Sequence, residues 1–287
     1  MNVCWKLRAR TKLLQKGKLF HMTAIIEVHD LVKRFGEHTA VNGINLEVEQ
    51  GEVFGLLGPN GAGKSTTIKM LITLLPPTSG GALVAGYDIV RQTANVRRSI
   101  GYVPQALSAD ATLTGFENLL IFAKLYDLPR KIQAQRVNEV LAFVGLAEAS
   151  KQMVQHYSGG MIRRLEVAQS LLHQPRVLFI DEPTVGLDPI ARQAIWDHLL
   201  TLRSQTDMTI FVTTHSMEEA DKLCSRVGIM HHGDIVALDT PANLKATVGG
   251  PETTLDDVFV HYAGDTLELG GSYRETSRAR RAARRLG

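Results

Sequence analysis

A glycine-rich segment is the first part of the chain whose residue types and spacing could do chemistry. Its eight residues are Gly58, Pro59, Asn60, Gly61, Ala62, Gly63, Lys64 and Ser65. Glycines let the backbone wrap closely around an anion, so consecutive N–H groups can point at phosphate oxygens. The segment follows an apolar run and precedes a helical pattern, whose positive dipole end favours the same negative charge. This G-x-x-x-x-G-K-[ST] pattern between a strand and a helix predicts a site for the phosphates of a nucleoside triphosphate.

The side chains that close this segment have separate expected tasks. We expect Lys64 to reach the β- and γ-phosphates and Ser65 to be a ligand of Mg²⁺. The next residue, Thr66, is expected to donate a hydrogen bond to the α-phosphate. The predicted small-molecule partners of the chain are therefore ATP and Mg²⁺.

Two adjacent carboxylates follow a second apolar run. Residues 177–180 read as a buried strand that ends at Asp181 and Glu182. Ligands bind at the carboxyl ends of strands in an open α/β sheet, and neighbouring strand residues point to opposite sides. Such a pair alone is typical of a solvated turn. Beside a phosphate segment, however, Asp181 suits the Mg²⁺ shell and Glu182 suits the polarisation of an attacking water.

The elements that would position these side chains follow from the apolar periodicity. The predicted strands are 24–28, 43–48, 53–57, 177–180, 210–213, 227–230 and 235–238, the last two joined by a hairpin at His232-Gly233. The predicted helices are 64–75, 115–126, 130–144, 161–173, 189–203, 217–224 and one after Pro241. Residues 81–104 are predicted as short strands and turns. Alternating strands and helices predict an α/β fold of the P-loop NTPase kind. We expect a mostly parallel sheet, an antiparallel β region, and a helical lobe at about 115–172.

The composition excludes several classes of protein. The 287 residues are 44% hydrophobic and 21% charged, which is enough apolar material for a buried core. No run approaches the roughly eighteen apolar residues of a membrane-spanning helix, and the N-terminus lacks the apolar stretch of a secretory signal. Cys4 and Cys224 are far apart and lack metal-ligand spacing, which favours a reduced, cytosolic setting over a disulfide framework.

Both ends of the chain are basic, although the net charge is only +3. Residues 1–22 hold six Lys or Arg and no acid, and residues 271–287 hold six Arg and one acid, Glu275. The part between them is therefore acidic, whereas a nucleic-acid-binding fold usually carries a basic stripe. We expect both tails to be flexible, solvated ends, with attraction to an anionic membrane surface as the alternative. A strand-like pattern begins just after Met22, so a native start at Met22 stays open.

A third motif lies shortly before the acidic strand. It reads Tyr157, Ser158, Gly159, Gly160 and Met161. With it, about residues 24–240 resemble the nucleotide-binding subunit of an ABC transporter, whose signature usually reads Leu-Ser-Gly-Gly-Gln. Both ends of the signature differ here, but Ser158 and the two glycines match, and the resemblance implies that they contact ATP. Ser158 is also a good helix N-cap, and the glycines would expose N–H groups at a helix start.

The same resemblance implies roles for four further residues. Gln105 looks like the family's glutamine that contacts Mg²⁺ and senses the membrane partner. His215 looks like the switch histidine that contacts the γ-phosphate. Asp188 looks like the key residue of the loop that couples two ATP sites. Phe35 occupies the place of the aromatic ring that stacks on adenine.

The resemblance also implies partners. In this family the signature of one subunit completes the ATP site of another, which implies a head-to-tail homodimer, or a heterodimer with a similar subunit. It further implies a separate multi-span permease that holds the chain at the cytoplasmic face of the inner membrane. Nucleic acid is not an expected partner. The form of the signature and the residues 254–259 resemble bacterial drug, polyketide and lipid-linked exporters.

The resulting prediction is an ATP-hydrolysing subunit of an exporter. Its expected parts are a basic extension 1–22, an ABC-type ATPase domain 23–240, a C-terminal helical extension 241–270 and an Arg-rich tail 271–287. Three alternatives stay open: a soluble ABC-type ATPase acting on ribosomes or nucleic acid, a regulatory nucleotide binder without turnover, and an importer subunit. Intact Glu182 and His215 argue against the second alternative, and the C-terminal motif favours export over import.

Overall fold

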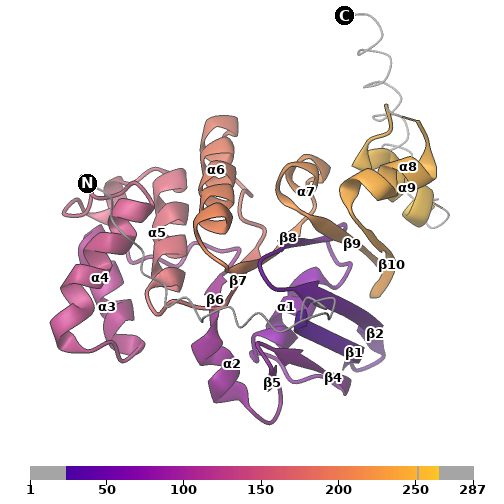
Figure 1. Cartoon of the computed structure of the whole chain (residues 1–287), viewed down its shortest axis with the longest axis horizontal. Coiled ribbons are helices and arrows are strands. Elements are labelled where there is room, and N and C mark those ends of the chain that lie inside the picture. The colour runs from indigo at the N-terminus through magenta and orange to yellow at the C-terminus, as the bar shows by residue number, and fades with distance from the viewer. Residues whose placement is uncertain (1–23, 251, 265–287) are drawn as a thin grey trace, which may run out of the picture.

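The computed structural model describes residues 24–250 and 252–264, and Figure 1 shows them as two sheets with helices around them. The predictions for the basic segment 1–22 and the Arg-rich tail 271–287 lie outside the described residues, as does a start at Met22. Within the described ranges, no helix is both long enough and apolar enough to cross a membrane.

The larger sheet forms the centre of the molecule and is mostly parallel. Its strands lie in the order β10-β9-β3-β8-β7-β6. They are β3 (Val53–Leu57), β6 (Ile100–Val103), β7 (Val177–Asp181), β8 (Thr209–Thr214), β9 (Arg226–His231) and β10 (Asp234–Asp239). Neighbouring strands are parallel, apart from the antiparallel pair β9 and β10. Strands β3, β7 and β8 are buried along their whole length, as expected for parallel strands that are covered on both faces.

The smaller sheet is antiparallel and packs on one face of the larger sheet. Its strands are β1 (Ala24–Phe35), β2 (His38–Glu49), β4 (Ser79–Val84) and β5 (Tyr87–Asp88), in the order β2-β1-β4-β5. Strands β1 and β2 extend well beyond the predicted 24–28 and 43–48. The reason is that their antiparallel pairing continues through several register shifts as far as Phe35 and His38.

Helix α1 (Lys64–Leu71) contacts strands of both sheets: β2 and β4 of the smaller sheet, and β7 of the larger one. Three phenylalanines of the larger sheet face the same core. The Phe211 ring packs at a tilt against Phe54 and Phe179, at ring-centroid distances of 5.2 and 5.4 Å. This core fixes the helix that begins at Lys64 against the strand that ends at Asp181.

Two local predictions on this side of the molecule were wrong. Helix α1 ends at Leu71 rather than at residue 75, because Thr73 has a φ of +65° and turns the chain out of the helix before Pro76. The segment predicted as strands and turns contains a helix, α2 (Thr93–Ser99). Helix α2 buries a single apolar side chain, Val96, so it has no apolar periodicity for sequence analysis to detect.

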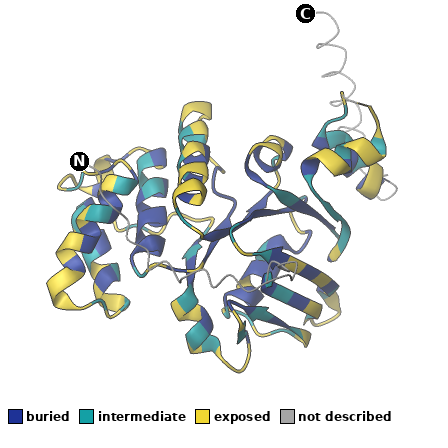
Figure 2. Cartoon of the chain, in the orientation of Figure 1, coloured by how far each residue is buried: buried dark blue, intermediate teal, exposed yellow. Residues whose placement is uncertain are grey.

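The remaining helices cover the opposite face of the larger sheet. They are α3 (Gly115–Leu125), α4 (Arg130–Phe143), α5 (Gly159–Leu171), α6 (Pro189–Gln205), α7 (Met217–Leu223), α8 (Pro241–Val248) and α9 (Leu255–Ala263). Their apolar side chains form a second core with Leu178 and Ile180, which alternate with Phe179 along β7. Helices α3, α4 and α5 pack on one another at the left of Figure 1, and we call them the helical lobe. Figure 2 shows that the central strands β3, β7 and β8 are dark blue, whereas the edge strand β10 and the outer sides of α3 and α4 are largely teal or yellow.

The turn between β9 and β10 braces the glycine-rich segment. His232 and Gly233 have φ values of +48° and +88°, as a two-residue hairpin turn requires, so the predicted hairpin is confirmed. The Gly233 N–H donates to Ala62 O at 3.0 Å, and Gly233 O accepts from the Asn42 N–H at 2.9 Å. The hairpin therefore joins the glycine-rich segment to strand β2.

Candidate nucleotide-binding and hydrolytic site

The glycine-rich segment connects the end of β3 to the start of α1. Gly61 and Gly63 have φ values of +81° and +110°, which side-chain-bearing residues rarely adopt. Gly58 needs to lack a side chain for a different reason, since a Cβ there would lie 2.2 Å from Met230 O. The residue types of the segment are thus required by its backbone path, which wraps around the N-terminus of α1 as the phosphate prediction expects.

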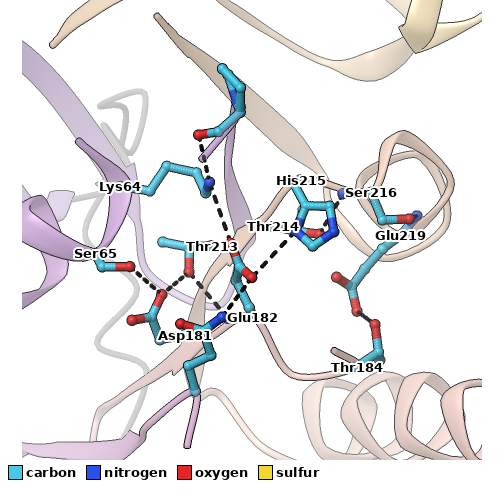
Figure 3. Close-up of polar contacts among 12 residues, drawn as sticks. Lys64, Ser65, Asp181, Glu182, Thr184, Thr213, Thr214, His215, Ser216 and Glu219 are labelled. Carbon is cyan, nitrogen blue, oxygen red and sulfur yellow. Dashed lines mark hydrogen bonds and ion pairs between the residues drawn. The ribbon is translucent and has the colours of Figure 1, made fainter. Parts of the chain in front are cut away.

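Lys64 opens α1 and is buried, with a relative exposure of 4%. Its ammonium donates to Gly58 O at 2.9 Å and to Pro59 O at 3.1 Å. It also lies 3.4 Å from Glu182 Oε1. The Lys64 ammonium therefore contacts both the glycine-rich segment and the Glu182 carboxylate that follows β7, as Figure 3 shows.

Asp181 lies at the end of β7, and one of its carboxylate oxygens accepts hydrogen bonds from two hydroxyl groups. Ser65 Oγ donates to Asp181 Oδ1 at 3.1 Å, and Thr213 Oγ1 on β8 donates to it as well. The Asp181 carboxylate and the Ser65 hydroxyl thus offer oxygen ligands, which are the kind that Mg²⁺ prefers, and Gln105 lines the same cavity as Ser65. Burial, followed by the charge of Asp181, raises the pKa of Tyr102 on the neighbouring strand β6 to about 12. The residues present thus fit the predicted Mg²⁺ site.

Glu182 is the centre of the polar network in Figure 3. It is buried and has a φ of +48°, an uncommon backbone conformation for a residue with a side chain. Its Oε2 accepts from Gln105 Nε2 at 3.0 Å and lies 3.3 Å from His215 Nδ1, while its Oε1 faces Lys64. Four residues that the sequence analysis selected separately are therefore in direct contact. Strained backbone of this kind clusters at functional sites.

His215 follows β8 and is half exposed beside Glu182. Its position is fixed by helix α7, which begins just after it with Ser216 as the N-cap. Glu219, one turn into α7, is buried and accepts from Thr184 Oγ1 at 3.0 Å and from Trp196 Nε1 at 2.9 Å. The helix after His215 is thereby tied both to the segment after Glu182 and to α6.

A cavity of about 410 Å³ opens at the glycine-rich segment, and Asp181 and His215 are not among the residues that line it. It is lined by Phe35, His38, Ala40, Asn60, Gly61, Gly63, Lys64, Ser65, Thr66, Gln105 and Glu182. Phe35 is half exposed at its edge, where the Lys33 ammonium lies 5.2 Å from the ring centroid. The phosphate segment, the predicted adenine-stacking ring and the predicted catalytic carboxylate thus face one space.

The signature residues and Asp188 do not line this cavity. Ser158 and Asp188 are the N-caps of α5 and α6, and their side chains accept N–H groups of the first helical turn. The first turns of α5 and α6 lie side by side, since a Cβ on Gly160 would meet the Ala191 Cβ at 3.0 Å. The structure therefore brings the predicted signature and coupling residues to each other rather than to the phosphate segment of the same chain.

Sequence reasoning missed two side-chain contacts, one at the site and one beside the signature. Thr213 holds Asp181, but it reads as one more residue of an apolar strand. Tyr157, which replaces the family's leucine, points inward and donates its hydroxyl to Ala149 O at 2.7 Å. The first contact joins two strands across 32 residues, and the second joins a side chain to a backbone oxygen eight residues away, so no local pattern indicates either.

Comparison with known proteins finds one matching family model and several relatives of the chain. Residues 41–185 match a family model described as "ABC transporter". The chain is 43% identical over 226 residues to the linearmycin resistance ATP-binding protein LnrL of Bacillus subtilis, covering 79% of this chain and 72% of that protein. It is 42% identical over 227 residues to the daunorubicin/doxorubicin resistance ATP-binding protein DrrA of Streptomyces peucetius, covering 79% of this chain and 68% of that protein.

A solved structure shows the same fold. It is described as the ATP-binding subunit of an ABC transporter, and it superposes with a TM-score of 0.73 at 29% sequence identity. The match covers 83% of this chain and 99% of that chain.

Proposed function

The chain belongs to the ABC transporter family as an ATP-binding, ATP-hydrolysing subunit, and we propose that it drives a separate membrane permease that exports a drug-like, polyketide or lipid-like substrate. The observation that carries the mechanistic part is the position of Glu182. Its carboxylate lies within contact distance of Lys64, Gln105 and His215 at the cavity of the glycine-rich segment. A carboxylate so placed can take a proton from water beside a bound γ-phosphate.

In this proposal the residues around the triphosphate divide the work of binding. Backbone N–H groups of residues 58–63 and the Lys64 ammonium hold the phosphate oxygens, Thr66 contacts the α-phosphate, and Phe35 stacks on the adenine. Ser65, Asp181 and Gln105 would hold Mg²⁺, which supplies positive charge that offsets the charge of the phosphates. When Lys64 turns to phosphate oxygens, the Glu182 carboxylate loses one ionic partner and can face the attacking water.

Hydrolysis in this proposal depends on positioning and electrostatics. Glu182 orients the attacking water in line with the γ-phosphate and accepts its proton. His215, which lies beside Glu182 and is followed by α7, contacts the γ-phosphate. Such positioning lowers the barrier because the groups are already oriented before the reaction begins.

We further propose a head-to-tail dimer, either of two copies or with a similar subunit. The separation of Ser158, Gly159 and Gly160 from the phosphate cavity supports it, because signature residues that contact ATP must then come from another subunit. In the dimer, Asp188 would lie between the two ATP sites. Sedimentation of the Glu182→Gln chain with and without MgATP tests this, and an ATP-independent monomer would contradict it.

The substrate class and location are proposed from the relatives. LnrL and DrrA are named for resistance to linearmycin and to daunorubicin or doxorubicin. We place the chain peripherally at the cytoplasmic face of the membrane, held by its permease. Residues 23–240 would be the ATPase domain and 241–270 a C-terminal extension, of which α8 and α9 share the core of α7.

Purification of the full chain from native membranes, with mass spectrometry of what accompanies it, tests the transporter part. A multi-span permease should co-purify, and the pair in inside-out vesicles should take up a daunorubicin-class fluorescent drug only with ATP. Recovery of ribosomes or DNA without a membrane protein would favour the nucleic-acid alternative. Drug movement in the opposite direction would favour an importer.

A further inference from the structure

Arg163 connects three parts of the site that are far apart in sequence. It lies on α5, and its side chain is almost completely buried, with a residue exposure of 1%. Its Nε donates to Pro183 O at 3.0 Å, and its Nη2 donates to Gln105 O at 2.9 Å. Its Nη1 donates to Pro104 O and to Glu166 Oε2, the latter at 3.0 Å. One guanidinium thus binds backbone oxygens of two segments, the one that carries Gln105 and the one that follows Glu182.

Glu166, one turn further along α5, completes this arrangement. Its Oε2 receives Arg163, and its Oε1 accepts from both the N–H and the hydroxyl of Ser108. Burial lowers the pKa of Arg163 and raises the pKa of Glu166, and each is opposed by the charge of the other. The loop from Pro104 to Ser108 is therefore held to α5 at both of its ends.

The two loops that Arg163 holds carry the side chains that meet at the site. Gln105 Nε2 donates to Glu182 Oε2, and Pro183 directly follows Glu182. The guanidinium therefore sets the distance between the backbones that carry the two partners of this contact. A planar group with five donors can satisfy three carbonyls and a carboxylate at once, which a lysine ammonium with three donors cannot do.

The helix that carries Arg163 and Glu166 also begins at the signature sequence. Ser158 caps the first turn of α5, and Arg163 lies five residues further on, about 7 Å along the helix axis. A single rigid helix thus bears both the signature residues and the group that holds Gln105 and Glu182. The signature is proposed to contact the ATP of the partner subunit. Helix α5 would therefore connect that ATP with the Glu182 carboxylate of its own subunit.

We propose that Arg163, fixed by Glu166, is a positioning residue for ATP hydrolysis, which ties the Gln105 loop and the Glu182 turn to the signature helix. Movement of the signature is thereby passed to the catalytic carboxylate. The inference rests on the proposed function, because it concerns the same hydrolytic site. It predicts a loss of turnover rather than a loss of ATP binding.

The test compares Arg163→Lys and Glu166→Gln with Arg164→Gln in the purified full chain. Arg164 is the matched control, because it is the next arginine on the same helix and its guanidinium donates to Val144 O and Gly145 O inside the helical lobe. We expect kcat to fall about tenfold or more in both test variants, with KM for ATP within about twofold, since positioning errors act on the reacting geometry. Arg164→Gln should keep the kcat of the wild type.

A second measurement separates positioning from a general loss of stability. In a Glu182→Gln background, Arg163→Lys should lower the single-turnover rate by less than twofold, because the group that it positions has already been disabled. A folded Arg163→Lys chain with wild-type kcat would overturn the inference, as would an equal proportional loss of ATP affinity and turnover. Absence of turnover in both the wild type and Arg164→Gln would instead overturn the proposed function.

Discussion

The Lys64 ammonium and Glu182 Oε1 lie 3.4 Å apart, and both side chains are almost completely buried. The pair joins the residue proposed to hold phosphate to the residue proposed to activate water. Removing one member of a buried pair leaves the other charge with fewer partners. The stability of the chain and its activity are therefore linked at this contact.

Glu182→Gln should retain ATP binding and lose turnover. We expect kcat to fall by at least about 100-fold, because the amide cannot accept the proton from water. ATP affinity should be equal to or tighter than that of the wild type, since Lys64 no longer faces a carboxylate. Steady-state hydrolysis and equilibrium binding of a fluorescent ATP analogue measure the two effects. The control is Glu218→Gln, which changes an exposed glutamate on α7 and should behave like the wild type. A near-normal kcat in Glu182→Gln would show that Glu182 does not activate the water.

The Lys64–Glu182 contact should be measurable as a coupling free energy. In a double-mutant cycle with Lys64→Met and Glu182→Gln, urea unfolding without nucleotide should give a coupling of about 1 kcal/mol or more. The matched control is the exposed pair Lys222 and Glu218, which lie 2.9 Å apart. That pair should couple by at most about 0.5 kcal/mol, because both charges remain in water. Equal coupling in the two cycles would contradict the importance of burial at Lys64.

Gly63→Ala should disable the phosphate segment. Gly63 has a φ of +110°, and a Cβ there would lie 2.4 Å from Ala40 O, so both the backbone and the neighbouring strand must shift. We expect ATP affinity to fall about tenfold or more and the free energy of unfolding to fall by about 1–3 kcal/mol. Gly81→Ala is the control, because its φ is not in the positive range and open space surrounds its Cβ position. Calorimetric ATP titration and urea unfolding of both variants would show the difference, and a normal Gly63→Ala protein would refute it.

Mild acid should destabilise the chain partly through His173. Burial, followed by the charge of Arg136, lowers the pKa of His173 below its usual value near 6.5, although the hydrogen bond to Ile100 O opposes this. The folded state therefore binds fewer protons at this group than the unfolded state does. Its stabilising contribution is complete above pH 6.5 and is lost as the pH falls towards the folded pKa.

This effect can be isolated by unfolding the wild type and His173→Gln in urea between pH 7.5 and pH 5.5. The wild type should lose more stability over this range than the variant, and His156→Gln, which removes an exposed histidine of the same region, should follow the wild type. Parallel pH profiles for the wild type and His173→Gln would show that His173 does not contribute.

The sequence was informative wherever a local pattern and a physical requirement coincided. The buried runs of β3, β7 and β8 were predicted because strands covered on both faces need continuous apolar residues. The glycine-rich segment was predicted because its backbone path requires Gly61 and Gly63. Helix α2 was missed because one buried residue, Val96, gives no period, and α1 was drawn too long because Thr73 gives no recognisable stop signal.

The contacts that connect the site could not be predicted in the same way. Arg163 meets Pro183 and Gln105 across sequence separations of 20 and 58 residues, and both contacts are to backbone oxygens. Backbone acceptors are the same for every residue type, so no residue identity marks the receiving positions. Sequence reasoning therefore selected the side chains that meet at Glu182, but it missed the arginine whose guanidinium binds the backbone on which two of them stand.

The hairpin of β9 and β10 has a consequence for the order in which the protein can be completed on the ribosome. The glycine-rich segment is braced by Gly233, and β3 lies between β8 and β9, which are synthesised much later. A nascent chain that ends before Arg226 carries every residue of the phosphate segment but lacks the strand and turn that hold it in shape. Nucleotide binding should therefore arise abruptly and late in translation, so the unfinished chain depends on other means to protect its apolar strands from aggregation.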